Sequence, residues 1–284
     1  MQTVIRDGIG LLHPGSMGAA VASQAVAAGA RVYWLPEGRS AATRRRAEEA
    51  GLTPAADLAT LTGSCWLIIS LCPPANAAEV ADAVAATGFT GVYLEANAIS
   101  PARSESLALA LARGGATTVD GGVVGPPPQR PGTTRLYLSG PQPAAADVAA
   151  VFARTALAPT VLPGPVGQAS ALKLAYASYN KITYLLAAQA AALANAHDVL
   201  PALFELTGEQ LADTPLGDPD RLRGAAPRAW RWGPEMREIA EACTAAGLTP
   251  DLALTAERLL ARWYAHKDDP SVPLDRLIAA LTLS

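Results

Sequence analysis

The sequence predicts a doubly wound, mostly parallel α/β domain followed by an all-helical domain, with one long helix joining the two. Up to about residue 160, short apolar runs alternate with alanine-rich helical stretches. Strands that alternate with helices in this way form a parallel sheet that helices cover on both faces. Residues 167–197 then form one long helical pattern without proline, and further helical segments follow. We expect one domain over residues 1–162 and a second over residues 163–284.

The expected strands are apolar runs bounded by turn residues. They cover residues 9–12, 31–35, 65–71, 91–95, 117–120 and 135–139. The expected helices between them cover residues 17–28, 41–50, 75–86 and 101–113. Gly29 directly follows the first of these helices, where glycine is a common helix stop.

Composition limits the classes of function. Half of the 284 residues are apolar, which is enough for a sizeable core, and the formal net charge is only −3. The only basic run is Arg44-Arg45-Arg46, which we interpret as a solvated helix face, so nucleic acid is not an expected partner. The chain opens without a signal-peptide pattern and has no stretch apolar enough to span a bilayer. We therefore expect a cytoplasmic protein without membrane contact.

The cysteines and histidines predict no metal site. Cys65, Cys72 and Cys243 are scattered, which is typical of a reducing compartment, and the first two lie in an apolar run as expected core residues. The three histidines are too dispersed to indicate a metal ligand set.

A strand, a glycine turn and a helix follow one another at residues 9–22. The unpaired N–H groups at such a helix start, together with the helix dipole, favour a phosphate. Gly15 would let the backbone approach a pyrophosphate, and Gly18 would let the helix pack closely. His13 and Pro14 replace the usual first glycine of G-x-G-x-x-G, so the motif alone could be an ordinary turn.

The end of the second strand distinguishes the two nicotinamide cofactors, because an acidic residue there binds the ribose hydroxyl of NAD. Here Gly38, Arg39 and Ser40 follow the strand, with Arg44 just beyond. Arg39 can pair with a 2′-phosphate and Ser40 can donate to it. Glu37 argues for NAD unless the turn points it outward. We expect NADP(H).

These motifs lie in a longer series of markers. The series comprises residues 13–18, 38–40, 70–74, 95–101, 120–125, 167–173 and 228–236. With these markers the chain resembles the β-hydroxyacid dehydrogenase superfamily, which includes 6-phosphogluconate dehydrogenase, 3-hydroxyisobutyrate dehydrogenase and the imine reductases. It is most similar to a branch with a phosphogluconate-dehydrogenase-like C-terminal domain.

The resemblance implies a Rossmann domain, a long linking helix and a helical domain, in a homodimer with an active site between domains. The nearly continuous apolar surface of the long helix also favours a dimer interface over a monomeric bundle core. The implied cofactor-binding residues are His13, Pro14, Gly15, Ser16, Met17, Gly38, Arg39, Ser40, Arg44, Leu71, Cys72, Pro73 and Asn97.

The resemblance also implies a catalytic lysine on the long helix, followed one turn later by an asparagine. Lys173 matches the lysine, but Ala177 stands in the asparagine position, and Asn180 lies two turns on. Tyr176 and Lys181 lie on or near the same face, and so does Tyr184. We expect this cluster to be catalytic. The alternative is that one lysine reaches solvent and the other pairs with a carboxylate.

The expected substrate-contacting residues are Val124, Trp230, Trp232 and Met236. Family members carry a carboxylate-binding serine where this chain has Val124. That departure favours the imine reductases, which have an apolar residue in this loop. Buried tryptophans usually provide packing, so Trp230 and Trp232 could instead belong to a core.

Three functions remain open. The first is an NADP-dependent oxidoreductase that moves a hydride between nicotinamide and a small carbonyl or alcohol, with Lys173 as proton donor. The second is an imine reductase, against which a cationic lysine argues because it would repel an iminium ion. The third is a non-catalytic NADP-binding protein, since a fold alone does not establish activity.

Overall fold

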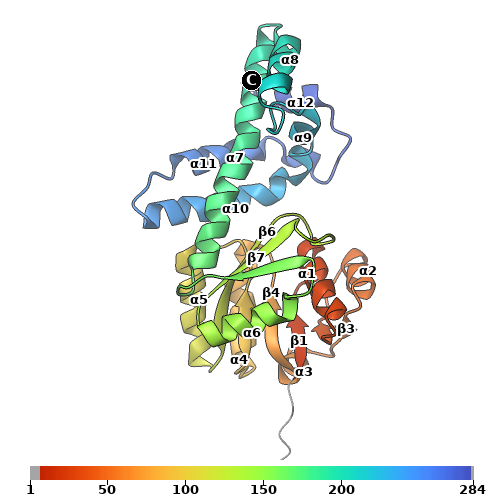
Figure 1. The fold of residues 1–284 in the computed structure, drawn as a ribbon, viewed down its shortest axis with the longest axis vertical. Helices are drawn as coiled ribbons and strands as arrows, with labels where there is room; N and C mark the ends of the chain where they lie inside the picture. The colour runs from red at the N-terminus through yellow and green to blue at the C-terminus, as the bar shows by residue number, and fades with distance from the viewer. Residues whose placement is uncertain (1–6, 283–284) are drawn as a thin grey trace, which may run out of the picture. The chain divides into compact units, whose positions relative to one another are not determined.

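The computed structural model describes residues 7–282. The chain divides into two compact units, the first ending at Lys173 and the second beginning at Leu174 (Figure 1). The division falls inside the long helix α7 (Gln168–Ala196), so this helix contributes its first turns to one unit and the rest to the other.

The first unit is built on one eight-stranded sheet. Its strand order is β3-β2-β1-β4-β5-β6-β7-β8, and every neighbouring pair is parallel except β6 and β7. This confirms the mostly parallel, doubly wound fold. The strands are β1 (Gly8–Leu11), β2 (Val32–Trp34), β3 (Thr53–Pro54), β4 (Cys65–Ser70), β5 (Val92–Glu95), β6 (Thr117–Val124), β7 (Thr134–Ser139) and β8 (Leu157–Val161).

Helices cover both faces of this sheet, and each face has its own core. Residues of α1 (Ser16–Ala27), α2 (Ala41–Glu49) and α6 (Gln142–Phe152) pack into one buried apolar cluster. Residues of α3 (Leu58–Ser64), α4 (Ala77–Ala86) and α5 (Pro101–Arg113) pack into the other, which also contains Cys65. The alanine-rich helices suit these positions because small side chains allow close approach to the sheet.

The second unit is helical. Beyond the end of α7 it comprises α8 (Leu200–Gln210), α9 (Pro219–Arg223), α10 (Ala229–Ala245), α11 (Asp251–Ala261), α12 (Leu274–Ala279) and two short 3₁₀ turns. Its core surrounds Trp263, which is fully buried and whose indole N–H donates to the carbonyl of Leu277 at 3.1 Å. Among residues 7–282, no helix is long and apolar enough to cross a membrane.

Candidate functional site

The site lies at the carboxyl edge of the sheet, where β1 and β4 are neighbours although β2 and β3 come between them in sequence. The chain therefore leaves these two strands in opposite directions, and such a switch point opens a crevice for ligands. The N–H of Leu12 donates to the carbonyl of Ile69 at 3.2 Å, so the pairing continues to the ends of both strands. The register brings the predicted segments 13–17 and 71–73 together.

The turn after β1 leaves the start of α1 open. Gly15 is the N-cap of α1, and no side chain caps this helix. A Cβ atom on Gly15 would meet nothing within 4 Å, whereas one on Gly18 would lie 2.3 Å from the carbonyl oxygen of His13. Gly18 thus holds the helix close to the turn, and the N–H groups that begin the helix face uncrowded space suited to a phosphate.

The loop after β2 supplies the predicted Arg39. Its guanidinium donates to the carbonyl of Leu12 at 3.1 Å, which places it against the turn after β1. Arg44 donates to the carbonyl of Arg39 at 3.2 Å. Ser40 has a structural task as well, because its hydroxyl accepts the Thr43 N–H at the start of α2. Gly38 adopts φ +67°, and Glu37 is exposed at this turn.

Arg46 corrects the interpretation of residues 44–46 as only a solvated helix face. It is half-buried, and its Nε donates to the carbonyl of Pro14 at 3.3 Å. Two arginines, Arg39 and Arg46, therefore support the turn between β1 and α1. The sequence signal was present in the basic run itself, but only the fold shows which of its members faces the turn.

His13 occupies the position of the missing first glycine. Burial, together with the Arg39 guanidinium, lowers the pKa of His13 to about 4, so the imidazole is neutral near pH 7. Its Nδ1 and the Nε of Arg39 are buried atoms without a hydrogen-bond partner among the described residues. A turn with uncapped N–H groups and the unpaired Arg39 Nε donor beside it fits the phosphates of a dinucleotide.

Asn97 joins the ends of β4 and β5. It is buried, its Oδ1 accepts the backbone N–H of Cys72, and its Nδ2 donates to Ser70 Oγ at 3.1 Å. Cys72 is half-buried rather than a core residue like Cys65, which corrects the expectation for this thiol. Burial and the nearby Glu95 raise the pKa of Cys72 to about 11, so the thiol stays protonated. Leu71 is half-buried and Pro73 is exposed.

Asp120 is a buried carboxylate that the sequence indicated only as part of a family marker. It is fully buried on β6 and lies at the start of α7. One oxygen accepts from the hydroxyls of Ser104 at 3.0 Å and Ser170. The other accepts from the Ser139 hydroxyl at 3.1 Å and the N–H groups of Gly167 at 3.0 Å and Ser170 at 2.9 Å. Asp120 therefore anchors the first turn of α7, where the helix dipole also favours a negative charge.

The predicted catalytic Lys173 reaches the same edge of the sheet. Its Nζ donates to the carbonyl of Ala96, just beyond β5, at 3.4 Å. Gly122 makes this possible, because a Cβ there would lie 2.7 Å from the carbonyl oxygen of Ala169 and 3.2 Å from the Lys173 Cβ. Gly122 thus lets the first turns of α7 pack directly on β6, which brings Lys173 to the edge of the sheet.

The other polar residues of the α7 cluster have different surroundings. Lys181 forms an ion pair with Glu235 inside the second unit, and its Nζ lies 5.9 Å from the ring centroid of Trp232. This is the carboxylate pairing that the sequence left open as the alternative for one of the two lysines. Asn180 is half-buried and Tyr176 is exposed. Lys173 is the one of the four predicted residues that belongs to the first unit, where it contacts the edge of the sheet.

The predicted substrate residues belong to both units, Val124 to the first and Trp230, Trp232 and Met236 to the second. Val124 ends β6 and is half-buried. Trp232 and Met236 lie in the core of the second unit, where Trp232 packs on Tyr184 at a centroid distance of 5.4 Å. This is the packing role left open for the tryptophan. Trp230 is half-buried, with its N–H 3.3 Å from Asp268 and the Lys267 ammonium 3.9 Å from its ring centroid.

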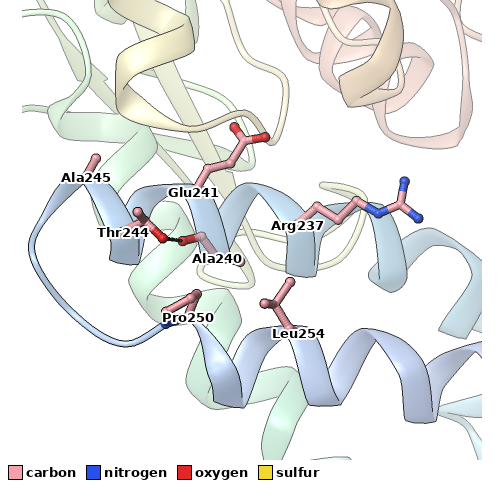
Figure 2. Close-up of a pocket in the computed structure, with 7 residues that line it drawn as sticks. All are labelled: Arg237, Ala240, Glu241, Thr244, Ala245, Pro250 and Leu254. Carbon is pink, nitrogen blue, oxygen red and sulfur yellow. Dashed lines mark hydrogen bonds between the residues drawn. The ribbon is translucent and has the colours of Figure 1, made fainter.

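A depression lies between α10 and α11 in the second unit. Figure 2 shows its lining, with the Thr244 hydroxyl bound to the Ala240 carbonyl on the same helix. It contains none of the predicted site residues. Across residues 7–282, no group of three or more histidine, cysteine or acidic side chains could hold a metal ion.

Two known family profiles match the chain, one in each of its two units. A profile described as the NAD binding domain of 6-phosphogluconate dehydrogenase matches residues 8–163, which is more than half of the chain. A second profile, described as a domain of unknown function (DUF1932), matches residues 194–263. No curated protein matches the sequence.

Solved structures share the fold over nearly the whole chain. The Mycobacterium tuberculosis 3-hydroxyisobutyrate dehydrogenase, solved with L-serine, is 17% identical with a TM-score of 0.76, covering 98% of this chain and 100% of that one. A Streptomyces aurantiacus imine reductase is 19% identical with a TM-score of 0.61, covering 97% and 100%. An Aspergillus terreus reductive aminase, solved with NADPH and ethyl levulinate, is 20% identical with a TM-score of 0.55, covering 97% and 99%. At these identities the likeness shows the fold.

Proposed function

Because the chain belongs to the family of the NAD binding domain of 6-phosphogluconate dehydrogenase, we propose that it is an NADP-dependent oxidoreductase acting on a small carbonyl or alcohol substrate. The family match and the structural neighbours support the general class, an oxidoreductase that uses a nicotinamide dinucleotide. The preference for NADP, the substrate class and the catalytic residue are inferred from the side chains at the edge of the sheet.

Lys173 carries the proposal. It is a cation brought to the carboxyl edge of a dinucleotide-binding sheet, and it contacts the backbone just beyond β5. A bound nicotinamide dinucleotide supplies or accepts the hydride. During reduction, the carbonyl carbon gains the hydride while Lys173 Nζ donates a proton to the oxygen, which yields an alcohol and a neutral amine. In the reverse direction the neutral amine takes the hydroxyl proton.

The first test is the consumption of NADPH with matched carbonyl and imine substrates of similar size. Turnover of ketones or 3-oxo acids, with weak or absent turnover of the imines, is the expected result. Binding of NADPH without turnover of any member of the panel would instead support the non-catalytic alternative.

The imine reductase alternative rests on Val124. This side chain ends β6, where it offers no hydrogen bond to a substrate carboxylate. Two of the structural neighbours are named as an imine reductase and a reductive aminase. Lys173 argues against this alternative, because an ammonium beside an iminium ion raises the energy of the substrate complex.

We expect NADPH to bind more tightly than NADH, and Arg39→Ala to remove most of the difference. A charge-assisted hydrogen bond contributes about 1.5–3 kcal/mol, so the loss should be roughly 10- to 100-fold in the affinity for NADPH. The loss for NADH should be smaller and should reflect only the support that Arg39 gives to the turn after β1. Calorimetric titration with both cofactors measures this. Arg45→Ala is the matched control, because Arg45 is an exposed arginine on α2, the helix that follows the Arg39 loop. If Arg39→Ala and Arg45→Ala behave alike, the assignment is wrong.

The exposed apolar face of α7 supports a homodimer. Tyr179, Leu186 and Leu193 repeat every seven residues, so they lie on one face of the helix, and each is at least 60% exposed. Tyr176 extends the same stripe at 52%. Contiguous exposed apolar surface of this kind marks an interaction site. A second copy of this helix, with the same apolar stripe, is a matching partner because a two-fold interface is self-complementary.

Leu186→Arg should convert the dimer to a monomer, because it places a charge in the centre of the stripe. Sedimentation velocity at micromolar concentration measures the change. Leu109→Arg is the control, since Leu109 is 68% exposed on α5, in the first unit. A wild-type chain that sediments as a monomer at this concentration would contradict the proposal.

A further inference from the structure

Glu95 is a buried carboxyl group that the proposed mechanism does not use. It ends β5 and has no exposed surface. Its Oε1 accepts the backbone N–H of Asn97 at 2.9 Å, whereas no hydrogen-bond partner is present for its Oε2 among the described residues. A buried carboxyl oxygen without a partner is unfavourable and calls for an explanation.

The charged and titratable groups around Glu95 come from each element packed on it. Asp120 is its register partner on β6, and Lys173 acts on it from α7. The Glu95 charge raises the pKa of Cys72, which follows β4, and the pKa of Tyr93, which lies on β5 itself. Lys173 is the cation of this group, and its Nζ is bound to the carbonyl of the very next residue, Ala96.

Burial dominates the ionisation of Glu95. Burial and the nearby Asp120 raise the pKa of this carboxyl, hydrogen bonds from Asn97 and the Lys173 ammonium oppose the rise, and the net result is a pKa of about 8. Glu95 is therefore mostly neutral at pH 7 and mostly ionised at pH 9. The change occurs beside an ammonium group and out of contact with solvent.

We propose that Glu95 is a positioning residue for Lys173. The charge of the Glu95 carboxyl then sets the pH range over which Lys173 keeps its proton. The geometry supports it through the contact of Lys173 with the carbonyl of Ala96, the residue next to Glu95, and through the buried Glu95 Oε2, which has no hydrogen-bond partner among the described residues. Only the consequence for catalysis rests on the proposed function, namely that Lys173 is the proton donor.

The direction of the effect follows from the charges. Below about pH 8 Lys173 lies beside a neutral carboxyl group, and above it beside a carboxylate. An opposite charge within about 4–6 Å favours the protonated lysine. As the pH rises, ionisation of Glu95 should therefore keep the Lys173 ammonium protonated to a higher pH than it would otherwise reach.

Competitive labelling of lysines with trace acetic anhydride tests this without a substrate. The pH dependence of acetylation, read peptide by peptide, gives the titration midpoint of Lys173. We expect Glu95→Gln, which keeps an acceptor for the Asn97 N–H but removes the charge, to lower that midpoint by about one pH unit. Lys181 serves as the internal control, and Glu79→Gln, an exposed residue of α4, as the matched variant. The midpoint of Lys181 should stay the same in Glu95→Gln, and the midpoint of Lys173 should stay the same in Glu79→Gln.

A second experiment, in which Lys173 is replaced and the titration of Glu95 is measured, tests the proposal even if Glu95→Gln does not fold. Because coupling between two sites is reciprocal, Lys173→Met should raise the titration midpoint of Glu95, followed by the carboxyl ¹³C shift, by the same amount. Unmoved midpoints for Lys173 in Glu95→Gln, or for Glu95 in Lys173→Met, would overturn the inference. An inactive chain that shows both shifts would refute the proposed function alone.

Discussion

Lys173→Met is expected to lower turnover about 10²- to 10⁴-fold, the usual effect of removing a general acid–base group. Methionine nearly matches the length of lysine but cannot donate a proton, and the partly buried position at Ala96 tolerates an apolar side chain. Affinity for NADPH should hardly change, because the turn at His13–Gly18 and Arg39 lies at other strand ends. Steady-state kinetics with the carbonyl substrate and a fluorescence titration with NADPH measure the two effects separately.

Lys181→Met is the matched control for this experiment. Lys181 pairs with Glu235, and the side chains are only 11% and 19% exposed. Its removal leaves a partly buried carboxylate without its cation, so we expect lower thermal stability with turnover that changes less than about 10-fold. Full turnover in Lys173→Met together with inactive, folded Lys181→Met would move the catalytic role to Lys181. Unchanged turnover in both would favour the imine reductase, whose substrate already carries the proton.

The inner strands and most helices of the first unit could be predicted because local patterns determine them, but the helices α3 and α6 were not predicted. The expected helix at 101–113 matches α5 (Pro101–Arg113), which begins with proline and ends before glycine. Two strands were not predicted, β3 and β8, and each contains a proline. Proline usually marks a break in a strand, but both strands lie at the edges of the sheet, where a missing N–H is tolerated.

The expected strand at 117–120 is too short for a related reason. β6 continues to Val124 through Gly121 and Gly122, which resemble a turn in the sequence. Gly122 is required by the packing of α7 on the strand, because a Cβ there would lie 2.7 Å from the Ala169 carbonyl oxygen, and Gly121 is required by the neighbouring strand, because a Cβ there would lie 2.8 Å from a Leu94 methyl group. A contact between segments so far apart in sequence leaves no local pattern.

Part of the candidate site could also be predicted from local sequence patterns, and part of it could not. Motifs in the sequence indicated the turn at His13–Gly18, the loop at Arg39 and the lysine of α7. Glu95 lies in one of the family markers and Arg46 in the basic run, but neither was singled out as a site residue, because an acidic or basic residue beside a strand or on a helix is ordinary until its burial is known. Asn180 and Lys181 shared a helical face with Lys173 by periodicity, but periodicity does not show which neighbour each side chain meets.

Asp120→Asn should reduce the free energy of unfolding by about 3–5 kcal/mol, the largest loss of stability that we expect from one substitution. Asp120 accepts from three hydroxyls and two backbone N–H groups, all of which are donors. An asparagine removes the negative charge and keeps one acceptor oxygen for the N–H groups of Gly167 and Ser170. Its N–H₂ group then faces the hydroxyls of Ser104 and Ser170, which must turn from donors into acceptors, so every charge-assisted bond at the start of α7 is weakened or lost.

Thermal unfolding at one protein concentration measures this loss, because an associating chain melts at a concentration-dependent temperature. A loss of this size corresponds to a decrease in Tm of roughly 10 °C in a protein of this length. Asp147→Asn, on the exposed side of α6, should melt like the wild type, and Ser104→Ala, which removes one of the donors, should lose about 1 kcal/mol. A Tm of Asp120→Asn within 2 °C of the wild type would show that α7 does not depend on this carboxylate. Lys173 would then be held at the edge of the sheet by the packing of α7 on Gly122 alone.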